Sequence, residues 1–232
     1  MTFDELQKLC AQQGILLQEK QVDKLKRYCE LLQEWNEKMN LTAITETEAV
    51  IEKHFYDCIL PLAAYEIGGK IADVGSGAGF PGVVWKIVRE DLDITLIEPT
   101  GKRCTFLRAV IDELGLSGIR AVSERSEDHV REHREEYDAV TARAVANLSV
   151  LSELCVPLLK KDGIFAAMKG MNALSEHEAA QNALKILHCE LIRVQDVKLP
   201  CGEERKNLFY RKTANTPQKY PRAYGQIKKK PL

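Results

Sequence analysis

The spacing of apolar residues changes near residue 68 of the chain. In residues 18–40, apolar side chains recur at steps of three and four, with Lys, Arg and Glu between them. This spacing predicts an amphipathic helix. A second helical pattern follows Thr45, and neither stretch alternates as a strand would. We therefore expect residues 1–66 to form a helical extension that packs on the rest of the protein.

After Gly68-Gly69, short apolar runs alternate with helical patterns. The predicted strands are 70–74, 93–98, 119–123, 137–141 and 163–168. The predicted helices between them are 81–89, 101–114, 149–160 and 175–187. Such alternation is typical of βαβ units and a mostly parallel sheet. Two more apolar stretches, 190–199 and 206–212, flank the turn Pro200-Cys201-Gly202 and predict an antiparallel hairpin.

Together these patterns predict an α/β protein with a Rossmann-like, mostly parallel seven-stranded sheet. The sheet ends in a C-terminal antiparallel hairpin and is preceded by the helical extension. The sheet and its helices would occupy residues 67–214, and a basic tail the residues 215–232.

Composition fits a globular, cytoplasmic protein. Hydrophobic residues make up 45% of the chain and charged residues 29%, which is ordinary for a packed domain. No apolar run approaches the roughly 18 residues of a membrane span. The first ten residues include two acidic ones, whereas a signal peptide begins with basic residues.

The cysteines and histidines do not indicate a metal site. The seven cysteines are scattered and none forms a CxxC pair, so we expect small buried thiols in a reducing compartment and no metal. His54 and Asp57 share a helical face, but two ligands are too few for a metal. His129 and His133 lie in a charged stretch, where we expect both side chains to be solvated.

The net charge of −1 hides an asymmetry. Nine of the 33 Lys and Arg residues lie in 205–232, which contains no acidic residue, so the first 204 residues carry a net charge of −10. Basic side chains with interleaved aromatic rings suit a polyanion such as RNA, although a solvated tail is the alternative. The candidate RNA-binding residues here are Arg205, Arg211, Arg222, Lys228, Lys229 and Lys230. Truncation after Thr216 is then expected to spare cofactor binding and weaken RNA binding.

A glycine-rich loop follows the first predicted strand. Asp73-Val-Gly75-Ser-Gly77-Ala-Gly79-Phe80-Pro81-Gly82 opens a helix, and Glu98 ends the second strand. Glycines permit a tight turn and close approach to a ligand, and the Glu98 carboxylate can accept hydrogen bonds from ribose hydroxyls. The sequence therefore predicts a nucleotide-type site.

The kind of nucleotide is a choice between two. Gly77, Gly79 and Gly82 satisfy GxGxxG, the dinucleotide fingerprint, so a nicotinamide-dependent oxidoreductase is one alternative. The acid two residues before Gly75 and the terminal hairpin favour an S-adenosylmethionine-dependent methyltransferase.

Several further motifs carry a resemblance that runs from about residue 20 to the end. They are Trp35-Asn36, Asn40-Leu41-Thr42, His54-Phe55-x-Asp57, the glycine loop, Glu98-Pro99-Thr100-x-Lys102-Arg103, Arg125-Ser126-Glu127, Thr141-Ala142-Arg143-Ala144-Val145-Ala146 and Met168-Lys169-Gly170. Together they resemble the glucose-inhibited division protein B family of bacterial methyltransferases. The resemblance implies methylation by S-adenosylmethionine of nitrogen-7 of a guanosine in the 530 loop of 16S ribosomal RNA. A non-catalytic, rRNA-binding assembly factor is a further alternative.

The resemblance also implies a site. Gly75, Gly77 and Phe80 would frame the cofactor, with Glu98, Pro99 and Thr100 near its ribose and adenine. Ser126 and Glu127 would border the adenine, and Arg143 would lie beside the methyl-transfer space. The partner would be 16S rRNA or a small-subunit particle, bound by a monomer.

Guanine nitrogen-7 already has a free lone pair at neutral pH, so the reaction needs positioning more than a general base. We expect Arg143 or Lys169 to orient the guanine, because basic side chains pair with its O6/N7 edge. The competing role for Arg143 is to hold the cofactor or a strand end. His54, with Asp57, would either join the helical extension to the core or position RNA.

Overall fold

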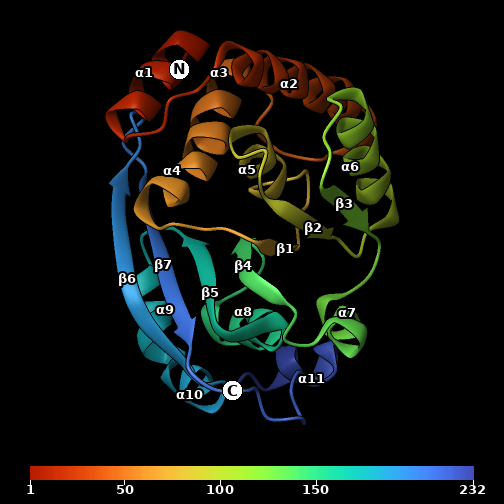
Figure 1. Ribbon diagram of the computed structural model, residues 1–232, viewed down its shortest axis with the longest axis vertical. Coiled ribbons are helices and arrows are strands. Elements are labelled where there is room, and N and C mark those ends of the chain that lie inside the picture. Colours follow the sequence, from red (N-terminus) through yellow and green to blue (C-terminus); the bar gives the residue numbers. More distant parts are fainter.

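A computed structural model describes residues 1–232. The strands form one seven-stranded sheet in the order β3-β2-β1-β4-β5-β7-β6 (Figure 1). The first five strands in this order are parallel, and β7 and β6 are each antiparallel to their neighbours. The predicted α/β fold with its terminal hairpin is therefore confirmed. The strands are β1 (Lys70–Val74), β2 (Asp93–Ile97), β3 (Ile119–Val122), β4 (Tyr137–Arg143), β5 (Leu159–Lys169), β6 (Cys189–Lys198) and β7 (Glu204–Lys212).

Helices cover both faces of the sheet (Figure 1). One face carries α1 (Phe3–Gln12), α2 (Glu19–Met39), α3 (Thr47–Val50), the π-helical turn η1 (Ile51–Tyr56), α4 (Asp57–Ala64), α5 (Gly82–Val88) and α6 (Gly101–Glu113). The other carries α7 (Ser126–His133), α8 (Leu148–Cys155), the 3-10 turn η2 (Val156–Leu158), α9 (Ala173–Ala179), α10 (Gln181–Ile186) and α11 (Tyr224–Lys229).

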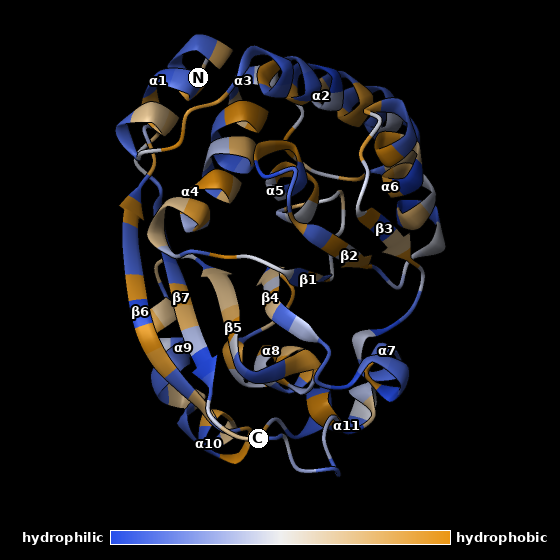
Figure 2. Cartoon of the chain, viewed as in Figure 1, coloured by the Kyte–Doolittle hydropathy of each residue, from blue (hydrophilic) through white to orange (hydrophobic).

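Successive residues of a central strand supply the two cores. Along β5, Ile164, Ala166 and Met168 belong to the cluster under α1–α6. Phe165 and Ala167, between them, belong to the cluster under α7–α11. Side chains alternate across a strand, so the part of β5 that is buried on both faces is a continuous apolar run, whereas its exposed start is hydrophilic (Figure 2).

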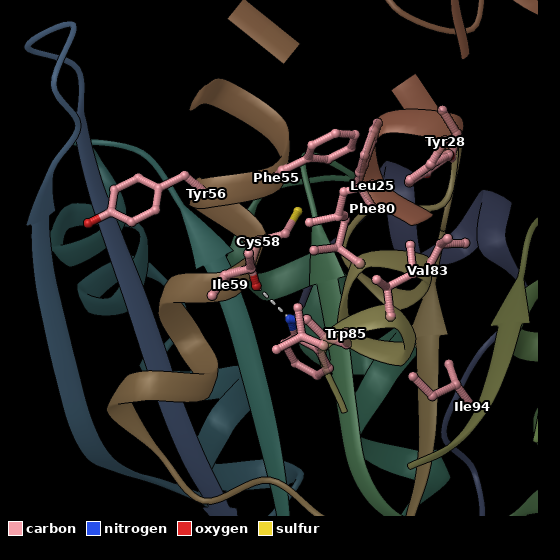
Figure 3. Packing of buried hydrophobic residues seen from close by; sticks show 14 of the residues in the cluster. Leu25, Tyr28, Phe55, Tyr56, Cys58, Ile59, Phe80, Val83, Trp85 and Ile94 are labelled. Carbon is pink, nitrogen blue, oxygen red and sulfur yellow. Dashed lines mark hydrogen bonds between the residues drawn. The ribbon is translucent and has the colours of Figure 1, made fainter. Parts of the chain in front are cut away.

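The helical extension shares its core with the sheet. Leu25, Tyr28 and Phe55 pack with Phe80 and Trp85 in one cluster (Figure 3). The Tyr28 hydroxyl donates to the Ala78 carbonyl oxygen. Polar residues separate the apolar ones along the outer side of α2 (Figure 2). Full burial of one apolar side chain in the shared cluster stabilises the fold by roughly 1.5–3 kcal/mol. The extension contributes many such side chains, and they hold it on the sheet.

The C-terminal segment is packed rather than free. Tyr220 and Ile227 are buried in the cluster under α7–α11. Arg222 forms a bidentate ion pair with Glu153, a fully buried carboxylate on α8, with Nη2 2.6 Å from Oε2 and Nε 2.9 Å from Oε1. Residues 215–232 are therefore anchored to the core through Tyr220, Ile227 and Arg222, while Lys228, Lys229 and Lys230 stay exposed.

Some elements differ from the prediction for local reasons. The helix expected over 149–160 ends at Cys155, because Pro157 starts a 3-10 turn and β5 then begins at Leu159. α7 was not predicted, and its His129 is buried, bonded to Glu124 and to the Tyr137 hydroxyl, and stacked on His133. The expectation that His129 is solvated is wrong, since these polar contacts replace water.

Candidate active site

The glycine loop joins β1 to α5. Gly75, Gly77 and Gly79 have φ of +70°, +59° and +98°, a region that residues with a Cβ rarely adopt. The Gly75 amide donates to the Ile97 carbonyl (2.8 Å), which ties the loop to β2. A Cβ placed on Gly77 would meet only one atom within 4 Å, the Gly75 oxygen at 3.9 Å. The loop therefore leaves open space above Gly77, where a ligand can approach the backbone.

Glu98 is buried beside this loop with lone pairs to spare. Its Oε2 accepts from the Gly77 amide and its Oε1 from the Thr100 amide, both at 2.9 Å. Each carboxylate oxygen can accept a second hydrogen bond. The Glu98 amide donates to the Val122 carbonyl, so the ends of β2 and β3 lie together. Glu98 is thus fixed in place and able to bind a diol.

The carboxylate of Asp73, at the end of β1, indicates what kind of ligand the loop suits. Its Oδ2 accepts from the Gly82 amide (3.0 Å), while its Oδ1 is buried without a partner. Burial raises the pKa of this carboxyl to about 7. An unpartnered buried acceptor is costly, and a positively charged ligand would relieve that cost. The glycine loop, Glu98 and Asp73 therefore fit a cationic nucleoside such as S-adenosylmethionine.

The other cofactor candidates lie at the same edge of the sheet. Pro99 and Thr100 are exposed at the end of β2. Ser126 begins α7, where its hydroxyl donates to the Leu154 carbonyl (2.6 Å), and Glu127 beside it is half-buried. Their contact with an adenine stays a prediction.

A cleft of about 550 Å³ lies beside the loop. It brings together side chains from distant segments: Ile44, Lys53, His54 and Asp57 from the extension, Arg143–Asn147 after β4, Met168, Lys169, Gly170 and Glu176 around β5 and α9, and Arg205 on β7. A Cβ on Gly75 would lie 2.6 Å from Val145, so the segment after β4 separates the glycine loop from the cleft. Of the cofactor candidates, only Arg143 lines the cleft.

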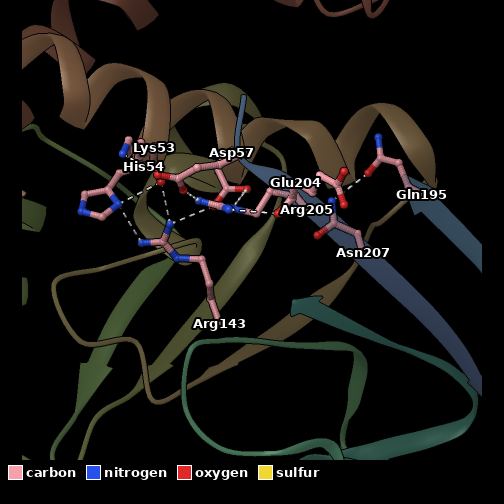
Figure 4. Close-up of polar contacts among 9 residues, drawn as sticks. Lys53, His54, Asp57, Arg143, Gln195, Glu204, Arg205 and Asn207 are labelled. Carbon is pink, nitrogen blue, oxygen red and sulfur yellow. Dashed lines mark hydrogen bonds and ion pairs between the residues drawn. The ribbon is translucent and has the colours of Figure 1, made fainter. Parts of the chain in front are cut away.

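Two guanidinium nitrogens of Arg143, Nη1 and Nη2, are engaged within the cleft wall (Figure 4). Its Nη1 donates to Asp57 Oδ2 and to the Lys53 carbonyl, both at 3.1 Å, and its Nη2 to His54 Nδ1 at 3.2 Å. The guanidinium lies 4.9 Å from the centre of the Phe80 ring. These contacts favour the strand-end and cofactor-side role of Arg143 over a contact with guanine.

His54 joins the extension to the glycine loop. Its ring lies 4.4 Å from that of Phe80. Burial and the charge of Arg143 lower the pKa of His54 to about 3, so the imidazole is neutral at pH 7. Its Nδ1 lies 3.0 Å from the Lys53 carbonyl oxygen as well as 3.2 Å from Arg143, and its Nε2 lies 3.0 Å from Thr42 Oγ1, so both ring nitrogens have polar partners. His54 is thus buried in the cleft wall.

Lys169 holds the segment after β4. Its Nζ donates to the Ala146 carbonyl (2.5 Å) and pairs with Glu176 Oε2 (2.7 Å). The same Oε2 accepts from the Leu148 amide at 2.9 Å. Our sequence analysis missed Glu176, whose only signal is its place in the first turn of the predicted helix 175–187.

The candidate RNA-binding residues are not gathered in one place. Arg205 lines the cleft and pairs with Asp57 and Glu203, whereas Arg211 is exposed on β7. Lys228, Lys229 and Lys230 are exposed in or next to α11, on the face of the sheet opposite the extension. Arg222 is committed to Glu153. A direct RNA contact by Arg222 would require breaking that buried pair.

Two general features complete the description. No three His, Cys, Asp or Glu side chains come together in an arrangement that could hold a metal ion. None of the helices combines the length and apolar character needed to span a bilayer.

The sheet with its reversed last strand, the glycine loop and the acid at the end of β2 define the class of S-adenosylmethionine-dependent methyltransferases. The solved structure of M. jannaschii TYW2 in complex with AdoMet shares this fold, with a TM-score of 0.57 and 14% identity over 73% of this chain and 79% of that one.

The family model for rRNA small subunit methyltransferase G (GidB) matches residues 21–208, and the chain belongs to this family. It is 45% identical to the ribosomal RNA small subunit methyltransferase G of Streptococcus sanguinis and 46% identical to that of Halalkalibacterium halodurans, over the full length of all three chains. The resemblance seen in the sequence is confirmed, and the nicotinamide-dependent alternative is overturned.

Proposed function

We propose that this protein transfers a methyl group from S-adenosylmethionine to nitrogen-7 of a guanosine in the 530 loop of 16S ribosomal RNA. Methylation of small-subunit ribosomal RNA follows from the family; the atom and the loop are the proposal. One observation carries it: the cleft beside the glycine loop is lined by no cysteine, and each His, Asp and Glu side chain that lines it is held by a Lys or Arg partner.

Every side chain in the cleft that could take a proton has a basic partner, Glu176 included. Both ring nitrogens of His54 have polar partners, and burial beside Arg143 lowers its pKa to about 3. Asp57 is buried between Arg143 and Arg205. Methylation of an exocyclic amine or a hydroxyl releases a proton, and methylation of a pyrimidine carbon generally uses a nucleophilic thiol. No cysteine lines the cleft. Guanine nitrogen-7 needs neither group.

The residues of the chain then act by holding the two reactants. S-adenosylmethionine supplies a methyl group on a positively charged sulfur, and the carbon–sulfur bond breaks toward sulfur as the nitrogen-7 lone pair bonds to carbon. The glycine loop, Glu98 and Asp73 hold the donor, and the wall formed by Phe80, His54 and Arg143 limits where a base can lie. Such orientation contributes up to roughly 7–11 kcal/mol in favourable intramolecular cases.

The charge of the cleft indicates the kind of substrate that it binds. The cleft is lined by four basic and two acidic side chains, which suits a polyanion. We take the substrate to be 16S rRNA or a small-subunit particle in the bacterial cytoplasm. We take the protein to act as a monomer, which size-exclusion chromatography of the active protein tests.

Methyl transfer from isotopically labelled S-adenosylmethionine tests the proposal. Unmodified small-subunit RNA and small-subunit particles are each incubated with the protein, and the nucleosides are analysed by mass spectrometry. Labelled 7-methylguanosine is expected, mapped to the 530 loop by nuclease fragments. A different labelled nucleoside would contradict the proposal. RNA binding without any transfer would favour an assembly factor.

A further inference from the structure

Most hydrogen-bond acceptors in the cleft already have donors. The Lys53 carbonyl accepts from Arg143, and the Ala146 carbonyl accepts from Lys169. Asp57 Oδ2 accepts from Arg143 at 3.1 Å, and Asp57 Oδ1, 3.4 Å from Arg205 Nε, is buried without a hydrogen bond and out of reach of a ligand. A base that enters the cleft finds few acceptors for its own N–H groups.

Glu176 is the exception. Its Oε2 is held by Lys169 Nζ at 2.7 Å and by the Leu148 amide at 2.9 Å, whereas its Oε1 takes part in no hydrogen bond or ion pair. The side chain is 28% exposed and lines the cleft, while that of Lys169 is only 7% exposed. Two contacts to one oxygen fix the carboxylate and leave the other oxygen available to a ligand.

The position of Glu176 relative to the glycine loop follows from the sheet. The loop begins at the end of β1, and Lys169 ends β5, with β4 between these two strands. Lys169 and Glu176 therefore lie on the side of the cleft away from the cofactor loop. A guanine whose nitrogen-7 points toward the loop presents its N1–H and its 2-amino group at the opposite end of the purine.

We infer that Glu176 Oε1 accepts hydrogen bonds from N1–H and the 2-amino group of the target guanine, and so selects guanine. This inference rests on the proposed function and adds the residue that reads the base. Adenine has an acceptor at N1 and no 2-amino group, so the carboxylate repels it. Enzymes that act on a base outside its helix generally read its Watson–Crick edge, and an acidic side chain matches two donors.

The test compares guanosine with inosine, which lacks the 2-amino group and keeps N1–H and nitrogen-7. Small-subunit RNA is ligated from a synthetic segment that carries either nucleoside at the target position. For the wild-type protein, inosine is expected to lower kcat/KM about tenfold, the value of one hydrogen bond to a charged group.

Glu176→Gln supplies the matched change in the protein. The Gln oxygen faces Lys169, so its amide donors face the donors of guanine. We expect kcat/KM for guanosine to fall by about tenfold to a hundredfold, and the preference for guanosine over inosine to disappear. Glu178→Gln, an exposed position on the same helix, should leave both values unchanged.

Two further measurements separate the outcomes. Affinity for S-adenosylmethionine and the melting temperature show whether Glu176→Gln keeps the site intact. If it does not, Glu176→Asp takes its place, because it retains the charge opposite Lys169 but is shorter. Its kcat/KM is then compared for guanosine and inosine in the same way. A folded variant with the wild-type guanosine-to-inosine ratio overturns the inference alone, as does a wild-type protein that does not discriminate. A wild-type protein that methylates neither purine at nitrogen-7 overturns the proposed function as well.

Discussion

Two buried carboxylates, Asp57 and Glu153, are each held by arginine but in different ways. Glu153 receives two guanidinium nitrogens and the backbone amide of a single residue, Arg222. Asp57 is shared between Arg143 and Arg205, which come from β4 and β7 (Figure 4). The first pair fastens one segment to a helix, whereas the second orients two side chains of the cleft. The same chemistry thus serves stability in one place and the shape of the site in the other.

Arg222→Ala should have the largest effect, and on stability alone. It leaves Glu153, which is fully buried, without its counter-charge, and breaking a buried pair in this way costs about 3–5 kcal/mol. Urea unfolding should show this loss, while the protein that remains folded transfers methyl groups normally. Lys228→Ala, in the same segment but exposed, is the control. A loss of methyl transfer without a loss of stability would show that the Glu153–Arg222 pair shapes the site instead of stabilising the fold.

The same contact changes the expectation for truncation after Thr216. That cut removes Arg222, Tyr220 and Ile227 together, so it should destabilise the fold and reduce binding of S-adenosylmethionine with it. The sequence alone predicts that cofactor binding is spared, and calorimetry on the truncated protein decides between the two.

Asp57→Asn should have a smaller effect on stability and a larger one on activity. The amide retains an oxygen for Arg143 but loses the charge shared with Arg205, so we expect a loss of about 1–3 kcal/mol. Displacement of the cleft wall should lower kcat/KM by roughly tenfold to a hundredfold. The check is steady-state transfer beside urea unfolding. Unchanged transfer would mean that Asp57 resembles Glu153 in its role.

His54 gives a third, pH-dependent effect. Its pKa is about 3 in the folded protein against 6.5 ordinarily, so the unfolded chain binds the proton first as pH falls. The stability that neutral His54 allows is present above pH 6.5 and is lost toward pH 3. Relative to His54→Gln, the wild type should lose up to about 1.4 kcal/mol per pH unit in this window. Parallel unfolding curves for the two proteins at pH 7 and pH 5 would refute this.

Asp73 acts in the opposite direction over part of this range. Burial raises its pKa to about 7 from 3.8, so the folded protein holds a proton that the unfolded chain has released, and stability falls as pH rises between these values. The comparison of wild type with His54→Gln cancels this contribution, because both proteins keep Asp73.

Replacement of Lys228, Lys229 and Lys230 by Ala should have the smallest effect. These exposed side chains have no ion-pair partner in the structure, so unfolding should not change. If they contact phosphate, the slope of log K against log salt for single-stranded RNA should fall by roughly 2, at about 0.7 for each contact. An unchanged affinity at low salt would exclude that role.

The cofactor side could be predicted from the sequence because its parts are contiguous. The strand before the glycine loop, the loop itself and Glu98 all lie between residues 70 and 98, and backbone geometry fixes what they do. The positions of the strands and the hairpin also followed from local apolar patterns. The contacts of individual side chains could not be predicted. Arg143 was a candidate for orienting the guanine, and the structure places it against Asp57, Lys53 and His54.

The cleft could not be predicted because its partners are far apart in sequence. Asp57 and Arg143 are 86 residues apart, and Glu153 and Arg222 are 69 apart. No local pattern reports such pairs. The basic C-terminal segment was misjudged for the same reason, since a run of positive charge does not reveal a buried acid elsewhere that neutralises one of its members.

The position of β7 within the sheet has a consequence for synthesis of the chain. β7 is the last strand made, yet it lies between β5 and β6. Domains generally fold as units during synthesis, and here β6 has no neighbour and the cleft has no Arg205 until residues 204–212 have left the ribosome. An unfinished chain therefore exposes an open edge of β5 and lacks a complete cleft. The enzyme becomes competent only when nearly its whole length has been released.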